Sequence, residues 1–152
     1  MSQYTRIVLA ERPQSEIDSK TFRTEIVPFD LRPNAKQILV QTIYLSLDPT
    51  QRTWLNDTRG YMKPVQIGEV MRSGGIGVVI QAGSGSRFQR GDTVFGMLGW
   101  REYVVLDDND PGLARIEVPP GVELIDFLGP LGITGLTAYF VGPGLLKPYV
   151  LR

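Results

Sequence analysis

The chemistry open to this chain is narrow, because its 152 residues include no cysteine and no histidine. Thiolate nucleophiles, imidazole bases and disulfides are therefore excluded. We expect no metal site, since carboxylates alone are a poor tetrahedral ligand set for zinc. Any acid–base step must use carboxylates, tyrosine, lysine, water or a bound cofactor. The stretch Leu47–Gly83 supplies three polar candidates, which are Arg52, Tyr61 and Glu69.

Each of these candidates also has a structural interpretation. Arg52 can bind a carboxylate or phosphate, or it can pair with Asp48 or Glu69 and fix the loop, and we favour the structural role. Glu69 can be a general acid or base if it is buried, or an ordinary hydrogen-bond partner. Tyr61, in TRGYMKP, can donate a phenolic hydrogen bond to a substrate oxygen, or it can be a half-buried loop aromatic.

The composition indicates a globular chain of one domain by length. Hydrophobic residues make up 42%, charged residues make up 21%, and the formal net charge is zero. A neutral chain gives no electrostatic support for nucleic acid or an anionic membrane as partner. The N-terminus lacks the apolar core of a signal peptide, and no long apolar run follows. We therefore expect a soluble cytoplasmic protein that acts on a small molecule.

Alternating apolar residues and scattered turn residues predict a mainly β fold. The expected strands cover residues 4–9, 22–29, 37–47, 68–82, 93–100, 101–106 and 115–118. Asp48 followed by Pro49 predicts the N-cap and first position of a short helix that runs through Trp54. After Pro120 the strict alternation is lost, which favours helical turns punctuated by Gly129 and Pro130. A β-barrel or curled sheet with helical pieces at one end follows from this pattern.

Glycines mark two special places in the expected strands. Gly74, Gly75 and Gly77 interrupt the strand over residues 68–82 and predict a bulge or the close approach of another backbone. The segment FQRGDTVFG predicts a tight turn that feeds a strand. Gly91 permits this turn and Asp92 can bond the backbone within it, so we interpret the segment as scaffold.

Several motifs together resemble one enzyme group. SLDPTQRTWLND, GYMKPVQIGEVMRSGGIGVVI, FQRGDTVFG, GWREY and LGITGLTAYF resemble, in order and spacing, the zinc-independent branch of the medium-chain dehydrogenase/reductases. The alkenal, curcumin and 15-oxoprostaglandin 13-reductases, which use NADPH, are the most similar group. The resemblance implies a GroES-like β-barrel with short helices over residues 1–127. A C-terminal helical segment and an atypical tail would occupy residues 128–152.

Members of this group carry a Rossmann domain that binds most of the NADPH. Its fingerprint needs a strand, a glycine-rich turn and a helix in one unit. Neither VGPG at residues 141–144 nor GSGS at residues 83–86 has that context. We therefore expect the chain to stop before the Rossmann domain and to bind no NADPH tightly by itself.

The resemblance also implies roles for individual residues. It places Tyr61 near the substrate carbonyl, where Tyr61, Glu69 and Arg52 form the candidate catalytic set. Residues expected to approach the cofactor are Pro49, Thr50, Gln51 and Thr137. Residues that could line an apolar substrate pocket with Tyr61 are Met97, Trp100 and Tyr103, although strand residues of these types are more often core.

Three functions remain open from the sequence. The first is a truncated NADPH-dependent enone reductase, whose ancestral reaction reduces an α,β-unsaturated carbonyl and which is not autonomous. The second is a repurposed cofactor-free isomerase, dehydratase or cyclase that acts on a polyketide- or terpenoid-like molecule in the old cleft. The third is a non-catalytic interaction module. All three leave an apolar C-terminal segment for the tail, a second copy or a partner protein to cover, formed by Phe127, Leu128, Leu131, Ile133, Leu136 and Phe140.

Overall fold

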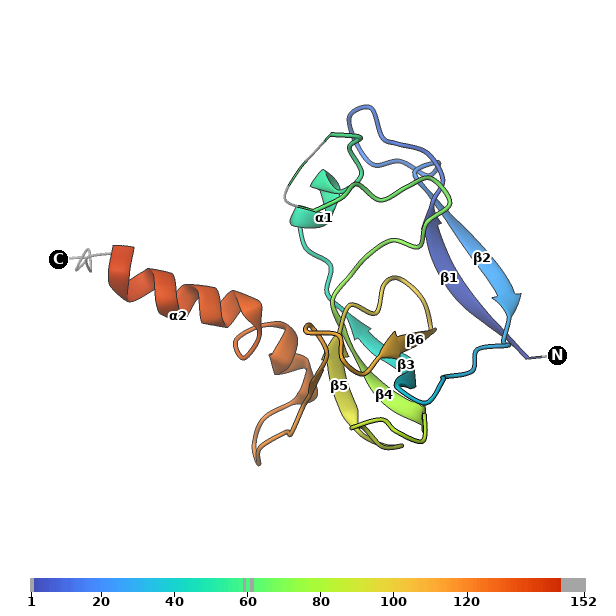
Figure 1. Ribbon diagram of the computed structural model, residues 1–152. Coiled ribbons are helices and arrows are strands. Elements are labelled where there is room, and N and C mark those ends of the chain that lie inside the picture. Colours follow the sequence, from blue (N-terminus) through green and yellow to red (C-terminus); the bar gives the residue numbers. More distant parts are fainter. Residues whose placement is uncertain (1, 59, 61, 146–152) are drawn as a thin grey trace. The chain divides into compact units, whose positions relative to one another are not determined.

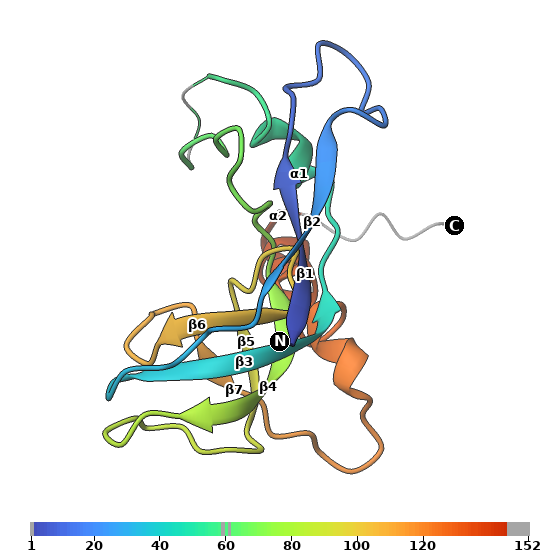
Figure 2. The same cartoon turned by 90° about the vertical axis from the view of Figure 1, so that its right-hand side faces the viewer.

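The computed structural model describes the backbone of residues 2–58, 60 and 62–145, and side chains as far as residue 141. Strands dominate the described chain, as Figures 1 and 2 show. The strands are β1 (Gln3–Leu9), β2 (Phe22–Pro28), β3 (Gln37–Leu45), β4 (Gly75–Ala82), β5 (Thr93–Gly96), β6 (Tyr103–Asp107) and β7 (Ala114–Arg115). The helices are α1 (Thr50–Thr53), the 3-10 helix η1 (Leu124–Leu128) and α2 (Ile133–Leu145). The predicted mainly β fold class is confirmed.

The strands form two antiparallel sheets. β1 and β2 pair with each other, from Gln3 opposite Pro28 to Leu9 opposite Phe22. The other strands pair in the order β6-β3-β4-β5-β7, and Figure 2 shows β1 and β2 running across the direction of β3. Isolated bridges join Arg6 to Arg101 and Val8 to Val70. Through these bridges β1 lies against the segments that line the candidate site.

Two clusters of buried side chains hold these sheets. One lies on the five-stranded sheet and contains Ile38, Val40, Val79, Phe88, Val94, Leu98, Val104 and Leu113. The other joins β1 to the loops around α1 and contains Leu9, Leu55, Val65 and Met71, with Phe22, Trp54 and Trp100 packed against it. Apolar area removed from water in both clusters is the main stabilising contribution. The second cluster fixes the loop that carries α1.

The glycines of β4 do what the sequence predicts. The register between β3 and β4 shifts between Leu39 and Val40 and again between Thr42 and Tyr44. A Cβ on Gly75 would lie 2.6 Å from the carbonyl oxygen of Tyr44, and one on Gly77 would lie 2.5 Å from that of Gln41. Only glycine allows these two strands to approach so closely.

Several strand ends differ from the sequence prediction. β4 begins at Gly75 rather than Gly68, and residues 68–74 contain only the bridge at Val70. β5 ends at Gly96 rather than Trp100, β6 covers Tyr103–Asp107, and β7 covers Ala114–Arg115. Gly68 and Gly99 have positive φ angles of 84° and 71°, which turn the backbone out of the extended conformation. The residues between these strands are therefore free to line cavities.

The turn before β5 matches its prediction. Gly91 has a φ of 95°, and the carboxylate of Asp92 accepts the backbone N–H of Gln89 at 2.9 Å. Asp92 also pairs with Arg115 on β7 at 2.7 Å. Val94 is fully buried immediately afterwards. This segment is scaffold, and the ion pair ties the short β7 to the turn.

The chain separates into two compact units, Met1–Ile116 and Glu117–Arg152. This division comes earlier in the chain than the proposed boundary after residue 127, which stays a prediction. The second unit contains η1 and α2, and the capping box of η1 pairs Glu123 with Asp126. The atypical tail of the prediction, from residue 146 onward, lies outside the described residues. No helix among those described is long and apolar enough to cross a membrane.

Candidate functional site

The loop after β3 is ordered by Asp48. Its carboxylate accepts the backbone N–H of Thr50 at 2.9 Å, and its carbonyl oxygen accepts the N–H of Gln51 at 3.0 Å. The predicted N-cap position is wrong by one residue, since Pro49 occupies it and α1 ends at Thr53. Proline cannot donate a hydrogen bond, so the acceptor one residue earlier satisfies the first free N–H. Pro49 and Thr50 are exposed on this loop.

Gln51 is the buried residue of α1, with 7% of its surface exposed. Its amide nitrogen donates to the carbonyl oxygen of Ser46 at 2.7 Å and to Ser73 Oγ at 3.3 Å. Ser73 Oγ in turn donates to the oxygen of Ser46. Gln51 therefore holds α1 against the start of β4, and both amide protons have partners inside the protein.

Arg52 has the structural role that the sequence favours, but with other partners than those expected. Its guanidinium donates to Asn56 Oδ1 at 2.8 Å and to the carbonyl oxygen of Ser15 at 2.7 Å. The predicted pairing with Asp48 or Glu69 is wrong. Asp48 is occupied by the backbone of α1, and Arg72 pairs with Glu69. Arg52 joins α1 to the loop between β1 and β2.

Glu69 is exposed, which removes the burial that a tuned acid or base needs. One carboxylate oxygen accepts the backbone N–H of Gln66 at 2.8 Å, and the other lies 3.5 Å from Arg72 Nη2. Its contacts are those of a loop-fixing residue. Tyr61, the first candidate of the sequence analysis, lies outside the described residues.

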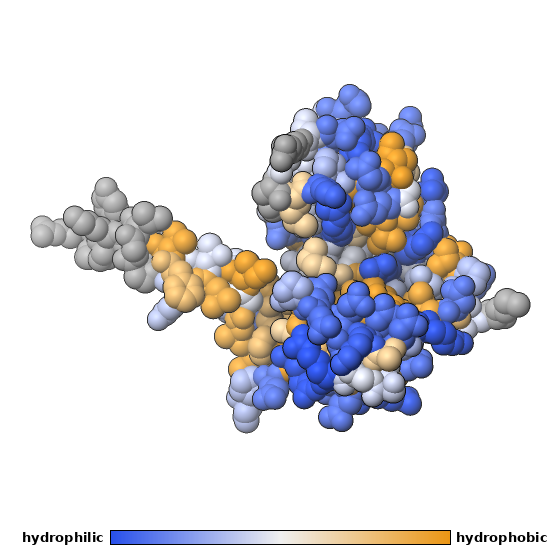
Figure 3. Space-filling view, in the orientation of Figure 1, coloured by the Kyte–Doolittle hydropathy of each residue, from blue (hydrophilic) through white to orange (hydrophobic). Residues whose placement is uncertain are grey.

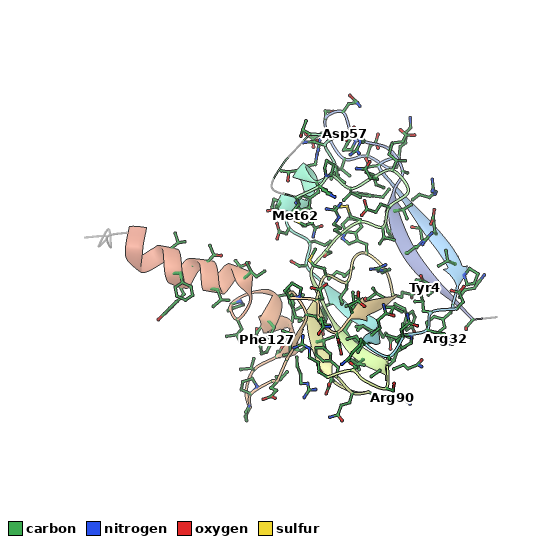
Figure 4. The ribbon with its side chains drawn as sticks, in the orientation of Figure 1. Tyr4, Arg32, Asp57, Met62, Arg90 and Phe127 are labelled. Atoms are coloured by element: carbon green, nitrogen blue, oxygen red, sulfur yellow. The ribbon has the colours of Figure 1, made fainter. Side chains whose placement is uncertain are left out.

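Two cavities lie beside these residues. The Met97 cavity, of about 450 Å³, is lined by Met62, Glu69, Val70, Met71, Arg72, Ser73, Met97, Gly99 and Arg101. It brings together Glu69 and Met97 from the predicted set, and Figure 4 shows Met62 near α1. Met97 is 40% exposed, so its side chain is available to a ligand. A volume of this size is typical of a small-molecule site.

The Trp100 cavity, of about 480 Å³, is lined by Thr5, Arg6, Ile7, Thr42, Ile43, Leu45, Leu47, Trp100, Arg101 and Glu102. Its wall contains Trp100 from the predicted substrate-binding set. Trp100 Nε1 and Thr42 Oγ1 are both buried and have no hydrogen-bond partner in the described part of the chain. The ring of Trp100 packs at 4.9 Å against Phe22, so much of this side chain serves the core.

Tyr103 and Thr137, two other predicted residues, are not among the residues that line the two cavities. Tyr103 is half-buried on β6 and makes edge contacts with Tyr4 at 6.0 Å and Phe29 at 4.8 Å. Figure 4 labels Tyr4, which belongs to this aromatic cluster. Thr137 lies on α2, where its hydroxyl donates to the carbonyl oxygen of Ile133 at 2.7 Å. The described contacts of Tyr103 and Thr137 are structural.

The described residues fit only a small part of a dinucleotide site. Every strand pairing is antiparallel, so residues 2–58, 60 and 62–145 contain no βαβ unit to cradle a pyrophosphate. The exposed loop at Pro49 and Thr50 could contact one end of such a ligand. No three carboxylates gather as a metal site within the same ranges.

Comparison with known proteins gives the family. Residues 5–113 match the family model described as the N-terminal domain of oxidoreductase. The chain belongs to this oxidoreductase family. This result confirms the resemblance to the medium-chain reductases, because the relatives of this chain include reductases that use NADPH.

Three relatives of this oxidoreductase domain show its place among longer proteins. The chain is 37% identical over 134 residues to the NADPH-dependent curcumin reductase of Escherichia coli, covering 88% of this chain and 37% of that protein. It is 33% identical to the NADP(+)-dependent 2-alkenal reductase of Nicotiana tabacum, covering 69% and 30%. The crystal structure of CurA from Vibrio vulnificus superposes with a TM-score of 0.80 at 30% identity, covering 90% and 39%. The oxidoreductase domain thus spans less than two-fifths of each.

Three polar side chains of the Met97 cavity, those of Arg72, Ser73 and Arg101, are not among the site residues that the sequence predicts. Ser73 is fully buried and connects α1 to β4, and Arg101 borders both cavities. In the sequence GWREY counts only as a family motif, which assigns no role to the charge of Arg101. An arginine directly after an aromatic residue, in Trp100-Arg101, is the available signal.

Proposed function

We propose that this oxidoreductase domain is the substrate-side domain of an NADPH-dependent enone reductase, which reduces an α,β-unsaturated carbonyl. The Met97 cavity carries the proposal, since it offers a ligand-sized space with a partly apolar wall on a barrel similar to that of curcumin and alkenal reductases. Four of its lining side chains are apolar, which suits the carbon chain of an enone. The cytoplasmic location expected from the sequence remains part of this proposal.

The proposed reaction divides the work between substrate groups and protein groups. NADPH, when bound, supplies a hydride to the β-carbon, and a proton adds to the α-carbon to give the saturated carbonyl and NADP⁺. A hydrogen-bond donor at the carbonyl oxygen stabilises the charge that develops there. Tyr61 remains the proposed donor from the sequence. Arg52 and Glu69 serve by fixing the loops on either side of it.

The cofactor part of the proposal follows from the strand pairings, since the described residues contain no βαβ unit to cradle a pyrophosphate. We expect Pro49, Thr50 and Thr137 to contact NADPH only when another part of the assembled protein holds the pyrophosphate. Gln51 would contribute by placing α1, since its amide protons are occupied. The 152-residue chain alone would then bind enone but bind NADPH weakly.

Binding of 3-nonen-2-one to the purified chain tests this function, followed by calorimetry and by ligand-observed NMR. We expect saturable binding that Met97→Trp weakens roughly tenfold, because the larger side chain fills the cavity. Ile43→Trp is the matched control, since Ile43 is similarly exposed but lines only the Trp100 cavity. Enone binding that is absent, or unaffected by Met97→Trp, would overturn the proposal. Turnover of the enone without NADPH would favour the cofactor-free enzyme.

We further propose that the apolar residues of α2 are covered by a second copy of this chain or by a partner protein. Ile133, Tyr139 and Phe140 are each at least 70% exposed, and Figure 3 shows hydrophobic side chains gathered along this helix. Large exposed apolar patches mark interaction sites in soluble proteins. This observation also favours the interaction module as the second candidate function.

Sedimentation of the purified chain tests the covered helix. The double variant Tyr139→Ser/Phe140→Ser should weaken self-association at least about tenfold, because it removes two large apolar side chains. The control Tyr44→Ser removes an exposed aromatic from β3 and should leave association unchanged. A chain that is monomeric at every concentration would exclude a second copy and leave a partner protein as the cover of α2. A monomer for which no protein that binds α2 is found either would contradict the proposal.

A further inference from the structure

Arg101 occupies a fixed position between the two cavities. Its backbone bridges Arg6 on β1, and its N–H donates to the carbonyl oxygen of Gly99 at 2.9 Å. The side chain is half-buried, and its Nε donates to the carbonyl oxygen of Leu98 at 2.8 Å. Arg101 lines both cavities, and this bond occupies Nε and leaves its two terminal amino groups for other partners.

The charge of Arg101 is not balanced by the side chains around it. Each ion pair among the described residues joins a carboxylate to another arginine, namely Arg6, Arg12, Arg23, Arg72 or Arg115. Burial lowers the pKa of Arg101, the Tyr4 phenol opposes that change, and the Arg6 cation adds to it. A half-buried guanidinium beside a second cation is costly unless an anion approaches it.

The two carboxylates that line these cavities with Arg101 already accept hydrogen bonds, and one of them, Glu102, lines the Trp100 cavity and accepts the backbone N–H of Thr5. The other, Glu69, lines the Met97 cavity, but it accepts the Gln66 N–H and pairs with Arg72. Arg72 also donates to the carbonyl oxygens of Lys63 and Pro64, which holds it at the loop. Glu69 and Arg72 therefore compensate each other, and Arg101 supplies the uncompensated charge of the cavity.

The rest of the cavity wall defines the kind of anion that fits. Met62, Val70, Met71 and Met97 are apolar, so a small inorganic anion would leave most of the wall unused. A planar guanidinium matches a carboxylate with two parallel hydrogen bonds. The combination suits a carbon chain that ends in a carboxylate.

We propose that Arg101 is a specificity-determining residue of the Met97 cavity, which binds the carboxylate of an enone acid while the apolar wall holds its chain. This inference rests on the proposed function and deepens it by naming the substrate class. Neutral enones would bind more weakly than acids of the same length.

Three probes of equal chain length test the inference on the 152-residue chain. They are 8-oxonon-6-enoate, the neutral 3-nonen-2-one and the saturated nonanoate, with binding followed by calorimetry. We expect the enone acid to bind roughly tenfold more tightly than the neutral enone, as a charge-assisted hydrogen bond predicts. Arg101→Gln should abolish this preference, and Arg101→Lys should restore part of it. Arg32→Gln is the control, because Arg32 is exposed and lines neither cavity.

The outcomes separate this inference from the proposed function. Equal binding of the enone acid and the neutral enone would overturn the role of Arg101 and leave the enone reductase proposal intact. Binding of nonanoate that depends on Arg101, without binding of 3-nonen-2-one, would support the anion site and contradict the enone function. A carboxylate preference that survives in Arg101→Gln, with circular dichroism confirming that this variant folds, would also overturn the inference.

Discussion

The two units of this chain treat their apolar residues differently. In residues 2–116 many large apolar side chains form two buried clusters, and Ile38, Val40 and Val79 are fully inaccessible. In the second unit, Ile125, Leu131, Ile133, Leu136, Tyr139, Phe140 and Val141 are all exposed by two-fifths or more. The first unit has a core of its own, whereas the second has apolar residues that only another surface can bury.

This difference teaches that apolar content does not by itself produce a core. α2 is apolar around much of its surface, so it cannot hide one face against its own unit and show a polar face to water. The antiparallel strands alternate, and each can send alternate residues into a shared interior. Stability should therefore reside in the barrel unit, and association in the helix.

The largest expected effect comes from removing a core side chain. Ile38→Ala should lower the free energy of unfolding by about 2–5 kcal/mol, because it leaves a cavity in the main cluster. Ile133→Ala removes the same atoms from α2, where 71% of the residue is exposed, and should cost less than about 0.5 kcal/mol. Urea unfolding measures both. Equal effects would show that the helix is buried in the free chain.

The next effect tests the close approach of β3 and β4. Gly77→Ala should destabilise the barrel unit by about 1–3 kcal/mol, because the new Cβ would meet the Gln41 carbonyl oxygen and the Val40 side chain. Gly60→Ala is the control, since its nearest neighbour would be 3.8 Å away. Thermal unfolding of the two variants gives the comparison. A Gly77→Ala variant as stable as Gly60→Ala would mean that the strands can move apart freely.

The smallest expected effect concerns Glu25 on β2, whose carboxylate pairs with Arg23 and Arg6. Hydrogen bonds from Arg23 and then Arg6 lower the pKa of Glu25 from its ordinary value of 4.5, and burial slightly opposes them. A lowered folded pKa gives stability that is fully present above about pH 4.5 and is lost as the pH falls through the folded value. Glu25→Gln should therefore be less stable than the native chain at neutral pH and equal to it in acid.

Urea unfolding between neutral and acidic pH measures this difference, with Glu16→Gln as an exposed control from the loop before β2. The control should track the native chain at each pH. A gap between Glu25→Gln and the native chain that widens on acidification would have the wrong sign for this ion pair.

Much of the barrel could be predicted from local sequence. The alternation over residues 37–45 and the β4 glycines depend only on side-chain direction and backbone sterics, which nearby residues determine. The turn at Gly91 and Asp92 is equally local. The ends of β4 and β5 were less predictable, because the turns at Gly68 and Gly99 depend on pairing with β1, far away in the chain.

The sequence alone determined which catalytic mechanisms are open to this chain and which family it resembles. The absence of cysteine and histidine removes thiol and imidazole mechanisms, and the ordered motifs point to the reductase family that the comparison confirms. Residue types and family motifs are properties of the chain itself, so they need no tertiary structure.

The tertiary structure decided which charged side chains are committed. In the folded chain Arg52 donates to the carbonyl oxygen of Ser15, 37 positions away. Glu69 accepts the N–H of Gln66 and pairs with Arg72. The tertiary structure also left Arg101 between two cavities without an ion pair to any carboxylate of the described residues. The contacts of Arg52 and Arg101 depend on distances between segments far apart in sequence, and the packing of β1 against residues 98–102 sets the position of Arg101.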